Sequence, residues 1–292
     1  MKIAVSGGAG FIGTNLLLLL RKRYPNCELM SLDVRAPSYP VDGVDYQRVD
    51  VTDLLALKTF LEPVDKIFHL AASIGTHESL DNPFGVFETN VKGTMNVLEC
   101  ARQFDIEVFV AGMPGIWNNP YSISKDAAIR MARCYYETYG TKVCALRWFS
   151  VYGDYQYVAR YNKAVPTFIS QALDGKPLTV YGDGEQVADF ILVDDAVLYA
   201  VRMIEEKQWG NVIECATGQG ISVNDLVNKI IQLSGSDSIV QHLPMRQGEP
   251  AGSHVVADTA KIDSLFPDVK RVDVQEGLKR TIEYYRAHPA ID

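Results

Sequence analysis

The glycine-rich segment at residues 7–13 constrains the fold of this chain more than any other feature of its sequence. It reads Gly-Gly-Ala-Gly-Phe-Ile-Gly and satisfies both the G-x-G-x-x-G and the G-x-x-G-x-x-G spacing. A β-rich run at 2–6 precedes it and a helical pattern at 11–23 follows it. Glycines between a strand and a helix allow a tight turn and bring the backbone close to an anion at the helix N-terminus. We therefore expect a strand–turn–helix unit that binds phosphate.

A single acidic residue extends this pattern to a dinucleotide site. Asp33 ends the next β-rich run, at the distance from Gly13 where dinucleotide-binding units carry a carboxylate for the adenosine ribose. Such a carboxylate repels a 2′-phosphate, so NAD is favoured over NADP, and Arg35 weakens this preference without reversing it. The predicted cofactor-binding residues at this point are Gly7, Gly10, Phe11, Ile12, Gly13 and Asp33.

Short β-rich runs alternate with longer helical patterns through the first half of the chain. We expect strands at 2–6, 28–32, 46–49, 66–70, 108–111 and 142–148, and helices at 11–23, 54–61, 83–104 and 121–139. Alternation at this spacing implies right-handed crossovers between parallel strands. The predicted fold class is α/β, a Rossmann-like doubly wound parallel sheet with helices on both faces.

The pattern loosens after Trp148, where Gly and Pro become frequent and the elements shorter. Helical patterns remain at 194–206, 222–234 and 274–287. We expect a Rossmann domain at 1–152, joined by part of 186–213, and a smaller C-terminal substrate-binding lobe at 153–292.

Composition excludes several classes of function. The 292 residues hold 28 basic and 36 acidic side chains, a net charge of −8 that disfavours nucleic-acid binding. The longest apolar run, at 16–20, falls far short of the roughly 20 residues of a membrane span, and the N-terminus is not typical of a signal peptide. The five cysteines are scattered and form no C-x-x-C, and the five histidines show no ligand spacing. We expect a cytoplasmic protein with reduced thiols and no metal.

Tyr121 and Lys125 are the predicted catalytic pair. Their i, i+4 spacing places the phenol and the ammonium on one face of a helix. Free tyrosine has a pKa near 10, and a close positive charge commonly lowers such a pKa by about 1–3 units. A tyrosine of this kind can carry the proton of a sugar or alcohol hydroxyl while a nicotinamide cofactor exchanges electrons with the same carbon, which is general acid–base catalysis.

Further motifs follow in order along nearly the whole chain. They are Asp50-Val51, His69-Leu-Ala-Ala72, Asn90-Val-Lys-Gly-Thr94, Pro120-Tyr121-Ser-Ile-Ser-Lys125, Leu146-Arg-Trp-Phe-Ser-Val-Tyr-Gly153, Val180-Tyr-Gly-Asp-Gly184, Asp189-Phe190 with Val193-Asp194-Asp195, and Arg246-Gln-Gly-Glu249. Together with the glycine segment and Asp33, they resemble the extended short-chain dehydrogenase/reductases, specifically the NAD-dependent nucleotide-sugar epimerase/dehydratase branch.

The resemblance implies further contacts to the cofactor. Asp50 and Val51 would flank the adenine, and Leu70, Ala71 and Ala72 would line the pyrophosphate side of NAD. Tyr121 and Lys125 would also lie at the cofactor, with Lys125 holding the nicotinamide ribose. Asn90 would either orient Lys125 through water or pack inside its helix, and His69 would be a packed residue at a strand end rather than a proton shuttle.

The resemblance also implies a nucleotide-diphosphate sugar as the ligand of the second lobe. Arg246 would contact a phosphate and Glu249 a ribose hydroxyl. The remaining predicted substrate-binding residues are Ser73, Ser150, Val180 and Tyr181.

Three departures from the family pattern bear on the substrate. The family places a Ser or Thr after the fifth strand, but here the stretch reads Val110-Ala-Gly-Met-Pro-Gly115, with no hydroxyl near Met113 and a short connection to Tyr121. Ser73 and Ser122 are candidates to fill that role. Ser150 stands where an Asn often meets the diphosphate, and Ala188 stands where an Arg usually binds phosphate.

The leading interpretation is an NAD-dependent nucleotide-sugar 4-epimerase that works through transient oxidation to a 4-keto sugar. A nucleotide-sugar 4-ketoreductase and a UDP-glucuronate decarboxylase remain alternatives within the fold. A 4,6-dehydratase is less favoured, because its Asp-Glu pair has no counterpart near Met113. From another class, a non-catalytic NAD-binding protein with a degraded active site stays open. The resemblance further implies a homodimer paired through the helices at 83–104 and 121–139.

Overall fold

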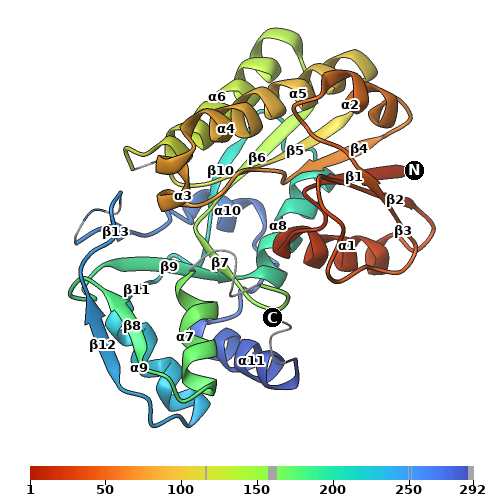
Figure 1. The fold of residues 1–292 in the computed structure, drawn as a ribbon. Helices are drawn as coiled ribbons and strands as arrows, with labels where there is room; N and C mark the ends of the chain where they lie inside the picture. The colour runs from red at the N-terminus through yellow and green to blue at the C-terminus, as the bar shows by residue number, and fades with distance from the viewer. Residues whose placement is uncertain (116, 157–162, 249, 251, 289–292) are drawn as a thin grey trace. The chain divides into compact units, whose positions relative to one another are not determined.

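The computed structural model describes residues 1–115, 117–156, 163–248, 250 and 252–288. Its chain divides into two compact units (Figure 1). The first unit comprises Met1–Trp148 and Val197–Ile213, and the second comprises Phe149–Ala196 and Glu214–Asp292.

Seven strands of the described residues form the main sheet, in the order β10-β6-β5-β4-β1-β2-β3. The strands are β1 (Lys2–Ser6), β2 (Glu28–Asp33), β3 (Val44–Arg48), β4 (Lys66–His69), β5 (Glu107–Gly112), β6 (Val143–Trp148) and β10 (Val212–Cys215). Neighbouring strands from β3 to β6 all pair in parallel. The predicted Rossmann-like doubly wound sheet is therefore confirmed, and the strand ends differ from the predicted ones by one or two residues.

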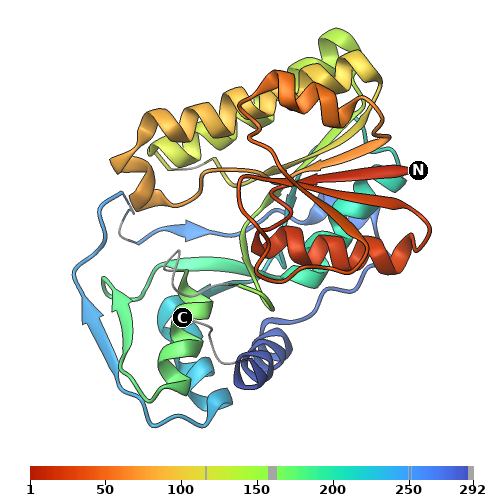
Figure 2. The same ribbon diagram turned by 45° about the vertical axis from the view of Figure 1, so that its right-hand side comes forward.

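Helices cover both faces of this sheet (Figures 1 and 2). Helix α1 (Phe11–Arg23) lies on one face, and α2 (Leu54–Leu61), α5 (Gly93–Phe104) and α6 (Pro120–Tyr139) lie on the other. Because the sheet is buried on both faces, its strands read as continuous apolar runs: Ile3, Ala4 and Val5 of β1 are all fully buried.

The strand order reverses between β1 and β4, which lie side by side although β2 and β3 come between them in the chain. In open α/β sheets, ligands bind outside the carboxyl ends of the strands at such a switch point. The glycine segment leaves β1 at this edge, and Leu70–Ala72 leaves β4 beside it.

The predicted helix at 83–104 is interrupted. It consists of α4 (Pro83–Phe87), a π-helical turn η1 (Glu88–Lys92) and α5. A short helix that sequence analysis did not predict, α3 (Thr76–Asp81), precedes it. A π-helical turn inserts one extra residue per turn and is frequent at functional sites. Here it contains Asn90, whose side chain is only 1% exposed.

The second unit has its own core. Strand β9 (Val187–Leu192) pairs with β7 (Ser150–Tyr152), β11 (Gly220–Ser222) and β13 (His254–Val255), and β8 (Leu178–Tyr181) pairs with β12 (Val240–Leu243). The helices are α7 (Ala164–Leu173), α9 (Val223–Ser234), α10 (Ala260–Leu265) and α11 (Val274–Ala287), while α8 (Val193–Glu205) crosses from this unit into the first. Phe168, Ile169, Leu226 and Ile230 pack the core between α7 and α9.

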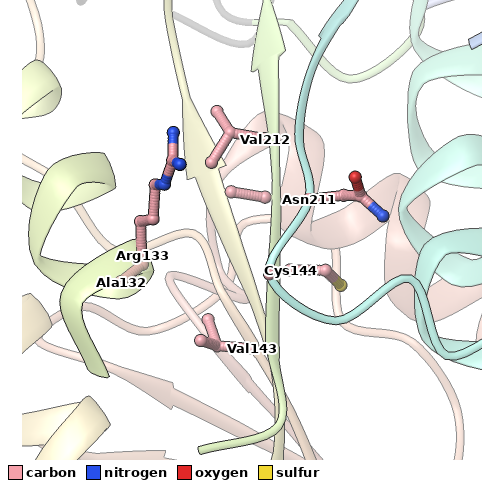
Figure 3. A pocket seen from close by; sticks show the side chains of 8 residues that line it. Ala132, Arg133, Val143, Cys144, Asn211 and Val212 are labelled. Atoms are coloured by element: carbon pink, nitrogen blue, oxygen red, sulfur yellow. The ribbon is translucent and has the colours of Figure 1, made fainter. Parts of the chain in front are cut away.

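A shallow depression, too small to enclose a water molecule, lies in the first unit between β6, the middle of α6 and the chain that leads into β10 (Figure 3). Cys144 and Asn211 are among the side chains around it, and no predicted site residue of the described chain lines it. Burial raises the pKa of the Cys144 thiol, so the thiol stays protonated and unreactive.

In the part of the chain that the structure describes, no helix combines the length and apolarity needed to cross a membrane.

Candidate functional site

The glycine segment lies directly against the end of β4. Gly7 has a φ of +74°, and a Cβ on it would approach the backbone nitrogen of Ala71 to 2.7 Å. A Cβ on Gly13 would approach the carbonyl oxygen of Gly7 to 2.3 Å. Any side chain at either position would collide with backbone, so the turn requires glycine at both.

The turn also presents an open helix N-terminus. Among the described residues, no side chain caps α1 at Gly10, and its first turn holds no acidic residue. The free N–H groups and the helix dipole therefore favour an anion at this end. Phe11 and Ile12, which begin α1, are half-buried. The segment fits the pyrophosphate of a dinucleotide.

Asp33 closes the turn from the neighbouring strand. Its Oδ2 accepts a hydrogen bond from the backbone N–H of Ala9 at 3.2 Å, and its Oδ1 accepts one from the N–H of Arg35 at 3.0 Å. The guanidinium of Arg35 lies 3.7 Å from Oδ1. A carboxylate at the end of β2 thus lies beside the glycine turn, as a group that accepts hydrogen bonds from ribose hydroxyls must.

The residues predicted to flank the adenine follow β3. Asp50 is exposed, and its Oδ1 accepts a hydrogen bond from the N–H of Thr52 at 2.9 Å. Val51 is 4% exposed, and its Cγ2 lies where a Cβ on Gly93 would approach to 2.6 Å. The loop after β3 is therefore packed tightly against the start of α5.

Lys125 is buried at the carboxyl edge of the sheet. Its side chain is 5% exposed, and its Nζ donates a hydrogen bond to the carbonyl oxygen of Ala111, near the end of β5, at 2.5 Å. Burial lowers the pKa of this ammonium to about 8. Tyr121 is half-buried, one turn earlier in α6.

Helix α6 begins where a cap and a proline dictate. Asn119 accepts a hydrogen bond from the N–H of Ser122 through its Oδ1 at 2.9 Å, and Pro120 occupies the first helical position. Both are favoured residues at a helix start. The cap therefore fixes the start of the helix, so that Tyr121 and Lys125 both lie in its first two turns.

Asn90 joins two segments of the site. Its Oδ1 accepts a hydrogen bond from the N–H of Ser73 at 2.7 Å. Its Nδ2 donates to the carbonyl of Ser73 and to the hydroxyl of Ser124, both at 2.9 Å. Both amide protons are thus engaged by the β4 loop and by α6. Of the two roles left open by the sequence, these contacts favour packing inside the first unit over orientation of Lys125 through water.

His69 is 1% exposed at the end of β4, and both of its ring nitrogens have partners. The Nδ1 lies 2.7 Å from the hydroxyl of Ser6, and the Nε2 lies 3.0 Å from the hydroxyl of Thr94. Burial, together with the charge of Lys125, lowers the pKa of His69 to about 3. The imidazole is therefore neutral at physiological pH. Sequence reasoning assigned no part in the site to Ser6 or Ser124, since isolated serines carry no motif of their own.

The stretch without a hydroxyl is tied to the sheet by its backbone. The carbonyl of Met113 accepts a hydrogen bond from Arg147 at 3.3 Å, and the same guanidinium pairs with Asp126 of α6 at 2.8 Å. A Cβ on Gly115 would meet Asp126 at 3.0 Å. Arg147, at the end of β6, thus links Met113 to Asp126 in α6.

The predicted substrate-binding residues, apart from Ser73, belong to the second unit. Ser150 lies in β7, and Val180 and Tyr181 lie at the end of β8. The guanidinium of Arg246 stacks over the Tyr181 ring, 4.4 Å from its centroid. Ala188 is a half-buried residue of β9 that packs on the second core. Glu249 lies outside the described residues.

The structure therefore brings together the predicted residues of the first unit. The glycine segment, Asp33, Leu70–Ala72 and Lys125 all lie at or follow the carboxyl ends of β1, β2, β4 and β5. Tyr181 and Arg246 form a separate pair in the second unit.

Comparison with known proteins assigns the chain to a family. The sequence model of the NAD dependent epimerase/dehydratase family matches residues 3–112 and 116–216. The chain is 27% identical to a UDP-N-acetyl-alpha-D-glucosaminuronate decarboxylase of Bacillus cytotoxicus over 310 aligned residues, which cover 97% of each protein. It is 26% identical to a UDP-glucuronate 4-epimerase of Thermodesulfobacterium geofontis, over 96% of this chain and 94% of that protein.

Solved structures agree. The crystal structure of the Thermus thermophilus UDP-glucose 4-epimerase in complex with NAD aligns with a TM-score of 0.89 at 26% identity, over 99% of this chain and 100% of that one. The gap in the family match, 113–115, falls in the stretch that lacks the hydroxyl. The chain belongs to the NAD-dependent epimerase/dehydratase family, and NAD is its cofactor.

Proposed function

We propose that the first unit binds NAD through the turn at Gly7, Gly10 and Gly13 and through Asp33. The close approach of the turn to Ala71 supports this assignment, because the loops after β1 and β4 then border one anion site. In the same proposal, Asp50 and Val51 flank the adenine, and Lys125 contacts the nicotinamide ribose. Bound there, NAD supplies the acceptor that takes two electrons from the sugar carbon and returns them.

We propose that the chain is a nucleotide-sugar 4-epimerase. The phenol oxygen of Tyr121 takes the proton of the sugar 4-hydroxyl as that carbon is oxidised, and gives the proton back once the 4-keto sugar has turned its other face. The ammonium of Lys125 stabilises the phenolate form of Tyr121, which is present before the first step and again after the second. The observation that carries this proposal is the burial of Lys125 on the same face of α6 as Tyr121. The carbonyl of Ala111, in β5, accepts a hydrogen bond from its ammonium.

The neighbouring reactions differ in the groups they require. A 4,6-dehydratase needs further acidic groups beside the reacting carbon, and the stretch from Ala111 to Gly115 supplies no carboxyl. A decarboxylase needs a uronic acid substrate, and one of the relatives described above carries that name. A ketoreductase consumes reduced cofactor from solution, whereas an epimerase retains its NAD through the cycle.

We propose that the second unit binds the nucleotide diphosphate of the substrate. The guanidinium of Arg246 would bind a phosphate, and the Tyr181 ring holds this guanidinium in place through the stacking contact. Ser150 completes the proposed contacts of this unit, together with Glu249, whereas Val180, which is 0% exposed in the second core, would support the site from within. Ser73 remains the proposed substrate contact of the first unit. All five cysteines are free thiols, which supports a cytoplasmic location.

The experiment that separates these reactions is incubation with a panel of UDP-, dTDP-, GDP- and CDP-sugars that includes two uronic acids. Products are identified by NMR, and released carbon dioxide and cofactor oxidation are followed in parallel. Interconversion of two 4-epimers without added cofactor supports the proposal. Carbon dioxide release indicates a decarboxylase, steady cofactor consumption a reductase, and bound NAD with no product a non-catalytic protein.

Asp33→Asn should weaken NAD binding by roughly 10-fold to 100-fold, the scale of one charge-assisted hydrogen bond. It should also narrow the preference over NADP, because Arg35 lies beside the lost charge. Calorimetry with both cofactors measures these effects. Asp45→Asn, an exposed residue of the adjacent strand β3, is the control. Equal NAD affinity in Asp33→Asn and the control would contradict the assignment.

Tyr121→Phe should lower turnover by roughly 10²–10⁴-fold, because the ring still packs while the oxygen that carries the proton is gone. NAD affinity should stay close to that of the parent. Tyr139→Phe, at the exposed end of the same helix, should leave both quantities unchanged. Parent-level conversion of the sugar by Tyr121→Phe would rule the mechanism out.

Turnover should decline above about pH 8. Burial lowers the pKa of Lys125 to about 8, so the side chain loses its proton and its charge as the pH rises through that value, and Tyr121 loses its electrostatic partner. The measurement is kcat across the alkaline range, with Lys125→Met as the comparison. This variant should be slow at every pH and should lack the alkaline decline, whereas a parent profile that stays level beyond pH 9 to 10 would argue against the role of Lys125.

We further propose a homodimer that pairs through the helices around α4, α5 and α6. Phe84 is 86% exposed on α4, and Phe87, Met95 and Ile123 add exposed apolar surface on the neighbouring turns. Burial of these side chains against a second copy of the chain would lower the free energy of the dimer relative to two monomers.

Phe84→Glu should therefore shift the protein toward monomer. Light scattering at micromolar concentration would give twice the mass of one chain for the parent and a lower mass for the variant. Leu55→Glu, at a position that is 77% exposed but lies on α2, should remain dimeric. A parent of single-chain mass would contradict the proposal.

A further inference from the structure

A series of hydrogen-bonded residues crosses the first unit from β1 to α6. It runs from Ser6 at the end of β1 to His69 at the end of β4, and on to Thr94 in α5. The Thr94 hydroxyl contacts the carbonyl of Asn90 at 2.6 Å, and the Asn90 amide reaches Ser124. Each of these five side chains is almost fully buried, so each hydrogen bond is shielded from competing water.

The last contact reaches the catalytic helix. The hydroxyl of Ser124 donates to the backbone carbonyl of Tyr121 at 2.8 Å. At the other end, the hydroxyl of Ser6 accepts a hydrogen bond from the N–H of Ala71 at 3.4 Å. The series thus joins the loop assigned to the pyrophosphate to the first turn of α6.

The direction of the series determines the tautomer of His69. A hydroxyl has one proton, and that of Thr94 is given to the Asn90 carbonyl. The Thr94 oxygen must therefore accept from His69, which places the ring proton on Nε2. The Nδ1 is then an acceptor, and the Ser6 hydroxyl donates a hydrogen bond to it.

The π-helical turn η1 lies at the centre of this series. It contains Asn90, and the helix resumes with Gly93 and Thr94 packed against the loop after β3 and against His69. In this arrangement the backbone carbonyl of Asn90 receives the Thr94 hydroxyl while its amide side chain meets both Ser73 and Ser124.

We propose that His69, as the neutral Nε2–H tautomer, is a positioning residue that fixes the first turn of α6, and with it Tyr121, relative to the cofactor loops after β1 and β4. This inference rests on the proposed function, in which Tyr121 carries the proton. His69 touches neither substrate nor cofactor in this scheme and acts through Thr94, Asn90 and Ser124.

The charge of His69 matters for the same reason. An imidazolium would donate from both nitrogens, so the Ser6 hydroxyl would have to turn its proton away from Nδ1. It would also add a second buried positive charge near Lys125, whose charge already acts on His69. The neutral ring donates to Thr94 and accepts from Ser6. It adds no second positive charge, so the ammonium of Lys125 is the cation that stabilises the Tyr121 phenolate.

The test uses paired substitutions in the full chain. Thr94→Val keeps the shape of the side chain but deletes the hydroxyl between His69 and Asn90, and Thr94→Ser restores the hydroxyl. His69→Leu and His69→Gln form the second pair, since glutamine can donate through its amide nitrogen near the position of Nε2. Thr281→Val is the matched control: Thr281 is 1% exposed and its hydroxyl donates to the carbonyl of Gly277, four residues earlier in α11 of the other unit, at 2.8 Å.

The first measurement is the split between kcat and KM for the converted sugar. We expect Thr94→Val to lower kcat by roughly 10-fold to 100-fold with little change in KM, on the scale of one misplaced reacting group. Thr94→Ser should recover most of the lost kcat, and the kcat of His69→Gln should be higher than that of His69→Leu. Thr281→Val should lose thermal stability without losing kcat. Parent-like kcat in Thr94→Val and His69→Leu, or equal losses in Thr94→Val and Thr94→Ser, would overturn the proposal.

The second measurement does not need a substrate. Hydrogen exchange, read by mass spectrometry on the NAD-loaded protein, reports the opening of the peptide that spans the start of α6. Exchange should be several-fold faster in Thr94→Val than in the parent, with Thr94→Ser and Thr281→Val close to the parent. If no sugar is converted even by the parent, the proposed function fails while this difference still supports the positioning role. Equal exchange in Thr94→Val and the parent would contradict that role, whatever the reaction proves to be.

Discussion

The close approach of two backbone segments, at Gly7 and Ala71, is the constraint on which the site of the first unit depends. A Cβ on Gly7 would lie 2.7 Å from the Ala71 nitrogen, so only a glycine at a positive φ permits the contact. This contact brings the turn after β1 against the loop after β4 at the point where the strand order reverses. The uncapped N-terminus of α1 and the loop that leads on to Ser73 therefore share one edge of the sheet.

The second constraint is the cost of burying Lys125. An ammonium removed from water requires hydrogen-bond acceptors and avoids other cations. The Ala111 carbonyl supplies the acceptor, and the neighbouring His69 stays neutral because burial and the charge of Lys125 both lower its pKa. Ser6 and Thr94 give the neutral ring a partner at each nitrogen, so no second cation lies beside Lys125. The same hydrogen bonds continue through Asn90 to the helix that carries Tyr121.

Much of the first unit could be predicted because its local patterns are strong. Strand β1 and helices α1 and α2 have the predicted bounds, since apolar strands, glycines and caps such as Asp53 act over a few residues. The helix predicted at 83–104 was wrong in its continuity, because a π-helical turn depends on packing around Asn90 rather than on propensity. Helices α3 and α7 were not predicted. Helix α3 has only six residues and is too short to show a period, whereas the apolar residues of α7 do follow a helical spacing, at 165, 168, 169 and 172, which the sequence analysis overlooked.

The sequence by itself determined the α/β class, the glycine turn, the acidic residue at the end of β2 and the shared helix face of Tyr121 and Lys125. Each of these follows from residue spacing within one element or one turn. Only the tertiary structure decided that Ser6, His69, Thr94, Asn90 and Ser124 form one hydrogen-bonded series, because these residues come from segments far apart in the chain. It also decided the protonation of His69 and Lys125, because burial and the distance between charges exist only once the sheet has brought β4, β5 and α6 together.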